Sequence, residues 1–281
     1  MPTLPAAVLE RYRRFSLYNS PYVAHGRGCA VDLYPWKREE DAVPSPVAGE
    51  VLDCRRVSAP PKSYAEEHDH LILVDTGEHV ARTLHVDPAV EPGDSVAVGD
   101  VLGRTVRAGF FAPWVDNHVH LGFREHGANH RRASGSLQLE VGVDPEGVAW
   151  DGSGRVQSVG ETYVVLDAPT HPAPGERWAS IAADDGHALD GGLVHYEGGG
   201  RYGGPDGPVS LLGQRVGEAE GRNVAWEGIA ILANGEPVTG LSLFVARDHP
   251  GAKLVCSGHD FEEGDRVEVS IEPTDDPVRL G

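Results

Sequence analysis

Two histidines stand two residues apart in the segment Asn117–Phe123, which reads Asn-His-Val-His-Leu-Gly-Phe. Residues i and i+2 of a β-strand point to the same face, so His118 and His120 would project side by side. Two imidazoles on one face suit a metal site in which one binds the ion and the other handles protons. A pair of surface histidines is the alternative, since the chain has 14 histidines. The metal interpretation therefore depends on other ligand-type residues in the same half of the chain.

Several further motifs precede this pair in a defined order. They are Gly28-Cys29-Ala30-Val31-Asp32, the segment Pro46–Val51, then Arg82-Thr83-Leu84-His85-Val86, and the glycine turn of Gly93–Gly99. With His118-Val119-His120 at the end, this order over residues 25–123 resembles the lysostaphin-type zinc metallopeptidases. The resemblance implies a barrel-sandwich hybrid fold for the N-terminal half, and it does not extend to the second half.

The resemblance also implies a role for each matching residue. Asp32 and His120 would bind zinc, which is the expected cofactor. His85 and His118 would orient or activate the attacking water and stabilise the developing oxyanion. The implied activity is a zinc-dependent hydrolase in which water attacks the carbonyl of a peptide-like substrate.

One ligand position departs from the family pattern. Gly28 stands four residues before Asp32, where the family has its first zinc ligand, and a catalytic zinc site normally has three protein ligands. His25 lies three residues earlier, and Gly26-Arg27-Gly28 is flexible enough to fold it back, so His25 is the candidate replacement. The alternative is a catalytically inactive binding or scaffold module that keeps the hybrid fold.

Other readings of the hybrid motif depend on different reactive groups. A biotinyl or lipoyl carrier needs a modified lysine between the two half-motifs, where only Lys62 lies, without a matching flanking pattern. A sugar-transport phosphocarrier needs a histidine pair that Leu73–His79 matches only loosely. We interpret His68 and His70 as solvated loop residues, and His126 and His130 as part of a linker.

The elements that must position these residues are mostly short β-rich runs. One amphipathic helix is predicted at Pro5–Ser16, and a polar linker at His126–Ser136. Glycine or proline interrupts the chain about every ten residues, which is typical of an all-β protein. The predicted strands are Glu50–Asp53, His70–Asp75, Val96–Val98, Val101–Val106, His118–Phe123, Thr162–Leu166, Trp178–Ala182, Ile229–Ala233, Leu241–Val245 and Arg266–Ile271. We expect an N-terminal domain over residues 1–136 and a β-sandwich-like domain of unknown role over 137–281.

The second half offers less chemistry. Gly198–Gly203 satisfies Gly-x-Gly-x-x-Gly, but the glycines and prolines that follow allow no helix to receive a pyrophosphate, so a flexible loop is predicted. Asp144 and Asp151 do not have the spacing of a calcium loop, and turn chemistry accounts for them. Asn234-Gly235 between two apolar runs predicts a tight hairpin.

Composition limits the partners. The chain of 281 residues has 43 acidic and 24 basic side chains, a net charge of −19, which disfavours nucleic acid and anionic membranes. Only three basic residues are lysines, a pattern that we associate with proteins adapted to salt, with a GC-rich genome as the alternative. The three scattered cysteines predict no disulfide framework. No secretory signal or long apolar run is visible, so a cytoplasmic location is expected.

Overall fold

The computed structural model describes residues 1–36 and 42–280, and within these the fold is all-β, as predicted. The chain divides into two compact units. The first unit combines Met1–Phe15 with Gly28–Val143, and the second combines Ser16–Arg27 with Asp144–Gly281. No helix among the described residues is long and apolar enough to cross a membrane.

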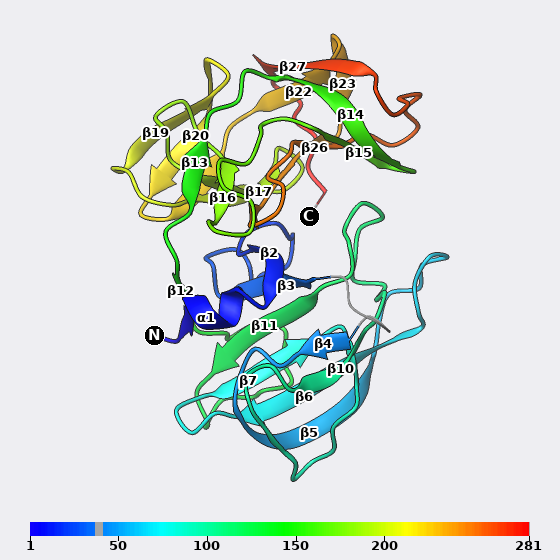
Figure 1. Ribbon diagram of the computed structural model, residues 1–281, viewed down its shortest axis with the longest axis vertical. Coiled ribbons are helices and arrows are strands. Elements are labelled where there is room, and N and C mark those ends of the chain that lie inside the picture. Colours follow the sequence, from blue (N-terminus) through cyan, green and yellow to red (C-terminus); the bar gives the residue numbers. More distant parts are fainter. Residues whose placement is uncertain (37–41, 281) are drawn as a thin grey trace. The chain divides into compact units, whose positions relative to one another are not determined.

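A single sheet forms most of the first unit, and its strands lie in the order β2-β3-β11-β7-β6-β5-β9 (Figure 1). From β3 to β9 each strand pairs with its neighbour in antiparallel fashion. The strands are β2 (Tyr12–Ser16), β3 (Ala30–Pro35), β5 (Gly49–Ser58), β6 (His68–Asp75), β7 (Val80–Leu84), β9 (Ser95–Val96) and β11 (Val119–Arg124).

The two faces of this sheet differ in character. Val31 and Leu33 of β3 lie beside Leu121 and Val119 of β11, and all four are completely buried. Because side chains alternate along a strand, the residues between them point to the opposite face. That opposite face carries Asp32 and His120, and we call it the histidine face. Because Val31, Leu33, Leu121 and Val119 must be buried on one face, Asp32 and His120 must point to the other.

Smaller elements complete the first unit. A three-stranded antiparallel sheet contains β4 (Ala42–Pro44), β10 (Val101–Thr105) and β8 (Val86–Pro88), and β1 (Thr3–Pro5) pairs in parallel with β12 (Glu140–Gly142). Two motif glycines are required by close backbone approaches. A Cβ on Gly49 would lie 2.0 Å from the carbonyl oxygen of Asp75, and one on Gly103 would lie 2.0 Å from that of Asp87.

The predicted helix at Pro5–Ser16 is wrong over most of its length. The helix α1 covers only Ala6–Leu9, and Tyr12–Ser16 forms β2. Tertiary contacts favour the strand: the Tyr12 hydroxyl donates a hydrogen bond of 2.6 Å to the Pro44 carbonyl, and Arg14 pairs with Asp116. Such contacts override a weak helical periodicity.

The second unit consists of a twelve-stranded antiparallel sheet and a small group of β13 (Glu146–Val148), β16 (Ala179–Ile181) and β25 (Val245–Ala246). The large sheet has the order β19-β20-β21-β18-β17-β24-β26-β15-β14-β27-β22-β23. Its strands are β14 (Ser153–Gly160), β15 (Tyr163–Leu166), β17 (Leu189–Leu193), β18 (Gly198–Arg201), β19 (Gly207–Leu211), β20 (Gln214–Glu220), β21 (Asn223–Trp226), β22 (Ile229–Ala233), β23 (Glu236–Val238), β24 (Gly240–Leu243), β26 (Lys253–Val255) and β27 (Arg266–Pro273).

Two sequence predictions in this unit have opposite outcomes. The Asn234-Gly235 hairpin is confirmed, because both residues have positive φ and join β22 to β23. The flexible loop predicted at Gly198–Gly203 is wrong, since Gly198–Arg201 forms strand β18. Its glycines allow aromatic rings to approach: a Cβ on Gly199 would lie 2.1 Å from Trp226, and one on Gly200 would lie 2.3 Å from Tyr18.

A buried carboxylate anchors the Ser16–Arg27 segment within the second unit. Asp190 on β17 is fully buried and accepts hydrogen bonds from the Ser16 hydroxyl, from the Leu17 N–H at 2.7 Å and from the Tyr202 hydroxyl at 3.3 Å. Burial raises the pKa of Asp190 to about 6, although these donors oppose the shift. The segment that carries His25 is therefore held by a group that titrates in mildly acidic solution.

Replacing Asp190 should change the pH dependence of stability. Between pH 4 and 6 the folded protein keeps a proton on Asp190 that the unfolded chain has already lost, so stability falls as pH rises through this range. Asp190→Asn removes this titration and retains an acceptor, so its free energy of unfolding should not show that decline. Urea unfolding of both proteins from pH 4 to 7 measures the difference, and parallel curves would contradict it.

Candidate metal centre

Asp32 and His120 form the centre of the site. They are direct cross-strand neighbours on β3 and β11, both point to the histidine face, and both are buried. The Nδ1 atom of His120 lies 3.1 Å from Oδ1 of Asp32. An imidazole nitrogen and a carboxylate oxygen are ordinary zinc ligands, so the sheet register alone brings two such ligands together.

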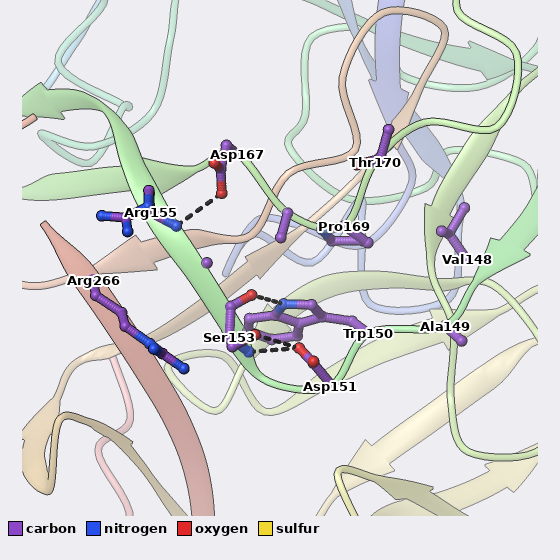
Figure 2. A pocket seen from close by; sticks show the side chains of 12 residues that line it. Val148, Ala149, Trp150, Asp151, Ser153, Arg155, Asp167, Pro169, Thr170 and Arg266 are labelled. Carbon is purple, nitrogen blue, oxygen red and sulfur yellow. Dashed lines mark hydrogen bonds between the residues drawn. The ribbon is translucent and has the colours of Figure 1, made fainter. Parts of the chain in front are cut away.

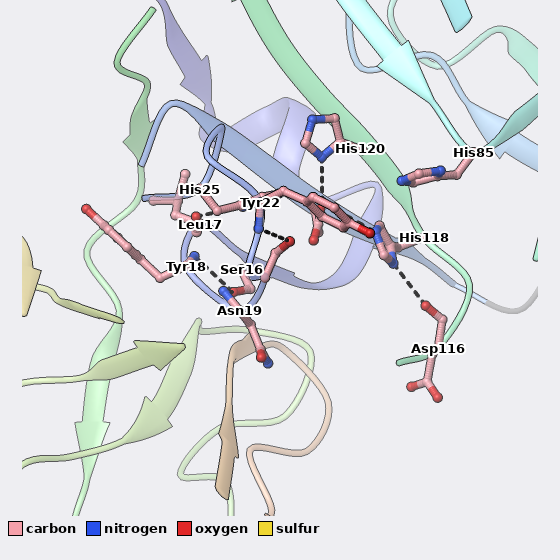
Figure 3. Close-up of polar contacts among 12 residues, drawn as sticks. Ser16, Leu17, Tyr18, Asn19, Tyr22, His25, His85, Asp116, His118 and His120 are labelled. Atoms are coloured by element: carbon pink, nitrogen blue, oxygen red, sulfur yellow. Dashed lines mark hydrogen bonds and ion pairs between the residues drawn. The ribbon is translucent and has the colours of Figure 1, made fainter. Parts of the chain in front are cut away.

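His118, in the loop just before β11, points to the same carboxylate. Its Nδ1–H donates a hydrogen bond of 2.9 Å to the carbonyl oxygen of Asp116, as Figure 3 shows. A neutral His118 therefore carries its lone pair on Nε2, which lies 3.3 Å from Oδ1 of Asp32. A lone pair that faces a carboxylate oxygen is unfavourable unless a proton or a cation lies between them. This geometry fits a site that binds a cation.

His85 follows the last residue of β7 and is held by Asp69 of β6. Its backbone N–H donates to Oδ1 of Asp69 at 3.0 Å, and its Nδ1 lies 2.6 Å from Oδ2. His85 has the unusual φ of 69°, which turns the ring away from the strand's alternation. Burial lowers the pKa of His85 although Asp69 opposes this. Burial alone would raise the pKa of Asp69, but the charge and hydrogen bonds of His85 outweigh it and the pKa is lowered.

The rings of His85, His118 and His120 lie close together. The ring centroid of His85 lies 5.2 Å from that of His118 and 5.9 Å from that of His120. Phe111 packs against two of them, with centroids 4.5 Å from His85 and 4.4 Å from His118. Strands β3 and β11, with the residues just after β7 and just before β11, thus bring Asp32, His85, His118 and His120 close together.

Arginines fix the loop that carries His118. The carboxylate of Asp116 pairs with Arg14 and with Arg13, the latter at 3.5 Å, while its carbonyl accepts from His118. The Arg14 guanidinium lies 4.0 Å from the centroid of the Tyr34 ring, which itself lies 5.1 Å from the His118 ring. These contacts hold His118 in one orientation.

His25 belongs to the second unit, in the Ser16–Arg27 segment. Its side chain is buried, and its Nδ1–H donates a hydrogen bond of 2.8 Å to the carbonyl oxygen of Leu17. Nε2 is therefore the nitrogen that carries the lone pair. Metal-binding histidines commonly donate their other N–H to a carbonyl in this way. The tautomer of His25 is the one that a ligand needs.

Both halves of the chain match one family. The family is described as a domain of unknown function, DUF8155; its N-terminal domain matches residues 3–141 and its C-terminal domain matches residues 146–272. The chain belongs to the DUF8155 family. Comparison with the curated proteins finds no match.

One solved structure similar to this DUF8155 member is the catalytic domain of the antimicrobial peptidase lysostaphin from Staphylococcus simulans. The sequences are 18% identical, and the match covers 47% of this chain and 92% of the lysostaphin domain, with a TM-score of 0.29. At that score the overall superposition is poor.

Sequence reasoning missed Asp69, the carboxylate that positions His85. The predicted strand begins at His70, whereas β6 begins at His68, so Asp69 is a strand residue with no exposed surface. An acidic residue between two histidines at a strand end was the available signal. His70 approaches Asp87 at 3.5 Å, while His126 approaches Asp75 at 3.0 Å and His130 contacts the Glu125 carbonyl, both on the exposed surface.

The second unit has a surface hollow, and none of the residues that line it is a histidine. Its lining includes Trp150, Asp151, Arg155, Asp167 and Arg266 (Figure 2). The hydrogen bonds drawn there are internal: Trp150 donates to the Ser153 carbonyl, Ser153 donates to Asp151, and the Arg155 N–H donates to Asp167. The acidic groups of this hollow are engaged in turns, in agreement with the prediction for Asp151.

Asp69→Asn should lower the pKa of His85 still further, because it removes the negative charge that favours the imidazolium. It should also lower the free energy of unfolding by about 1–3 kcal/mol, because an amide cannot accept all three hydrogen bonds that the carboxylate accepts. NMR titration of the histidine rings and urea unfolding measure the two effects.

Asp75→Asn, also on β6, is the matched control, because Asp75 contacts Gly77 and His126 and neither of the site histidines. It should leave the His85 titration unchanged. An unaltered His85 pKa in Asp69→Asn would show that this pair does not set the histidine's charge.

Proposed function

We propose that the first unit is a zinc-dependent hydrolase of the lysostaphin peptidase type, acting on a peptide carbonyl. The observation that carries this proposal is the meeting of four buried residues: Asp32 of β3, His120 of β11, His85 just after β7 and His118 just before β11, with His85 and His118 held in a defined tautomer. The barrel-sandwich hybrid architecture is part of the same proposal, supported by the glycine-dependent close approaches at Gly49 and Gly103.

The proposed zinc ligands are Asp32, His120 and His25. Each of these side chains is buried and offers one ligand atom. His25 precedes Gly28 by three positions, so their Cα atoms lie within about 11 Å of each other wherever the segment runs. The positive φ of Gly28, 61°, permits a sharp turn at that point. Covalent connection and tautomer thus support His25 as the third ligand.

The charges around the site favour a divalent cation. Asp32 and Asp69 are buried carboxylates, and the pKa of Asp69 is lowered, which keeps it ionised. The pKa of His85 is lowered, which keeps this imidazole neutral. Asp32 and Asp69 thus place two buried carboxylates beside the imidazoles, and a bound cation would compensate their charge.

His85 and His118 are the proposed proton-handling residues. Each donates through Nδ1, to Asp69 and to the Asp116 carbonyl, so each neutral ring presents Nε2 as an acceptor. Such a nitrogen can accept a proton from the attacking water and, once protonated, can donate to the developing oxyanion. A bound zinc ion would supply Lewis-acid polarisation of the carbonyl and a lowered pKa for water.

The second candidate function is a non-catalytic binding module. Gly28 favours it, because this residue removes the ligand that the peptidase family has at that position. The two candidates make different predictions for metal binding and for peptide cleavage, so one set of variants tests both.

The wild-type protein should bind one zinc ion, and His120→Ala should weaken zinc binding by more than about 100-fold because a ligand is lost. His25→Ala should also weaken it strongly. Isothermal titration calorimetry after removal of metal with a chelator measures each affinity. His126→Ala removes an exposed histidine of the same unit and should bind zinc as the wild type does.

His118→Ala should keep zinc and lose about 10²–10⁴-fold in the rate of peptide cleavage, since its proposed role is proton transfer. Cleavage of a peptide library that includes oligoglycine sequences, followed by mass spectrometry, measures this. Zinc binding without cleavage would favour the binding module. Absence of saturable zinc binding by the wild type would refute the hydrolase.

A further inference from the structure

A buried arginine without a partner lies on the same face as the candidate metal site. Arg82, on β7, is only 8% exposed. Within the described part of the chain, its guanidinium makes no hydrogen bond or ion pair, and its Nε is buried without an acceptor. A buried guanidinium that lacks acceptors is costly, because it has lost its water and gained nothing in return. The structure therefore provides a mostly buried guanidinium whose Nε–H has no acceptor.

Strand register places Arg82 beside the site residues. On β11, His120 lies opposite Leu84 and Gly122 lies opposite Arg82. Arg82 and His120 therefore point to the same face, one two-residue step apart along the strands, roughly 7 Å. The backbone of Arg82 thus lies about 7 Å from that of the proposed zinc ligand His120.

A hydroxyl lies over the same register position. A Cβ built on Gly122 would lie 3.0 Å from Oγ of Ser136, so Ser136 covers the glycine opposite Arg82. The chain is fixed there by a hydrogen bond of 2.8 Å from the Leu137 N–H to the Phe123 carbonyl. Oγ of Ser136 is buried and, like Arg82, has no hydrogen-bond partner in the described structure. Two hydrogen-bond donors without acceptors, the Arg82 guanidinium and the Ser136 hydroxyl, thus belong to the position where Arg82 pairs with Gly122.

The surrounding charges are mostly positive, although the chain as a whole carries −19. Arg55 also points to this face, and Arg124 of β11 donates to the carbonyls of Asn129 and Arg132. Asp53 is the acidic residue of this part of the face, and it already pairs with Arg55 at 2.6 Å and with Arg131 at 3.6 Å. No carboxylate is left for Arg82.

Asp69 does not fill this role. Its oxygens already accept from the ring and the backbone N–H of His85 and from the N–H of His70, and it forms no ion pair with Arg82. Burial, together with the charge of Arg124, lowers the pKa of Arg82 to about 10, and Asp69 opposes these effects only in part. An additional negative charge would stabilise Arg82.

We propose that Arg82 and Ser136 form a subsite for an oxyanion, a carboxylate or a phosphate, carried by the substrate of the neighbouring site. A guanidinium binds two oxygens of such a group in parallel, and a serine hydroxyl donates to a third position. The inference deepens the proposed hydrolase function by specifying an anionic peptide-like substrate, and it rests on that function. The anion site itself needs no metal.

The test uses the full chain after removal of metal by a chelator, at constant ionic strength. Three probes are titrated: inorganic phosphate, N-acetyl-aspartate amide, and the uncharged N-acetyl-asparagine amide. The wild type should bind phosphate or the aspartate derivative with saturation, and should not bind the asparagine derivative. Whichever anion binds more tightly identifies the carboxylate or the phosphate as the preferred group.

Arg82→Gln should weaken anion binding at least tenfold, and Ser136→Ala should weaken it several-fold. Arg56→Gln is the matched control, because Arg56 is an exposed residue of β5 that points to the opposite face. It should bind the anion as the wild type does. Thermal unfolding provides a second readout: Arg82→Gln should be at least as stable as the wild type, and saturating anion should raise the melting temperature of the wild type and of Arg56→Gln but not that of Arg82→Gln.

Equal anion binding by Arg82→Gln and the wild type would overturn the proposal, as would the absence of saturable binding. A marked loss of stability in Arg82→Gln without added anion would also overturn it, by showing that Arg82 has a structural partner. Anion binding by a chain that does not bind zinc would support the subsite and refute the hydrolase. Zinc binding without anion binding would refute the subsite alone.

Discussion

The register between β3 and β11 is the constraint on which the candidate site depends. It places Asp32 directly opposite His120, with Val31 and Leu33 buried on the reverse face beside Leu121 and Val119. A slip of one residue would turn the carboxylate into the hydrophobic face and a valine or leucine toward the histidines. The same apolar residues that stabilise the sheet therefore also determine the chemistry of its other face.

A second level of organisation fixes the histidine tautomers. His25, His85 and His118 each have Nδ1 against an oxygen of the Leu17 carbonyl, the Asp69 carboxylate or the Asp116 carbonyl. Two of these oxygens belong to the backbone and cannot be replaced by changing a side chain. Because Nδ1 is committed in each case, the opposite nitrogen is the one available for a metal or a proton.

Short motifs predicted the centre of the site but not its supports. The two-residue spacing of His118 and His120 identified a shared face, and the resemblance supplied Asp32 and His85. For Asp69 the only local signal was its place between two histidines, and its contact with His85 depends on the pairing of β6 with β7. Arg82 is invisible for a related reason: whether a buried arginine has a partner is known only when every neighbouring acceptor is placed.

Local patterns failed where long-range pairing decided the conformation. The apolar spacing in Pro5–Ser16 fits a helix, yet Tyr12–Ser16 extends because its tyrosine and arginines find partners far along the chain. The glycines of Gly198–Arg201 indicated flexibility, whereas the absent side chains make room for Tyr18 and Trp226. The Asn234-Gly235 turn, which depends only on its own φ angles, was predictable.

The chain passes between the two units three times, after Phe15, after Arg27 and after Val143. A single cut after Val143 would therefore not release two complete modules, because the C-terminal fragment would lack the Ser16–Arg27 segment, which supplies two of the donors for Asp190. Recombination at the junction after Val143 would separate the buried carboxylate of Asp190 from its donors Ser16 and Leu17. The two units of this chain are therefore interleaved in sequence, and each depends on a segment that lies beyond the boundary of the other.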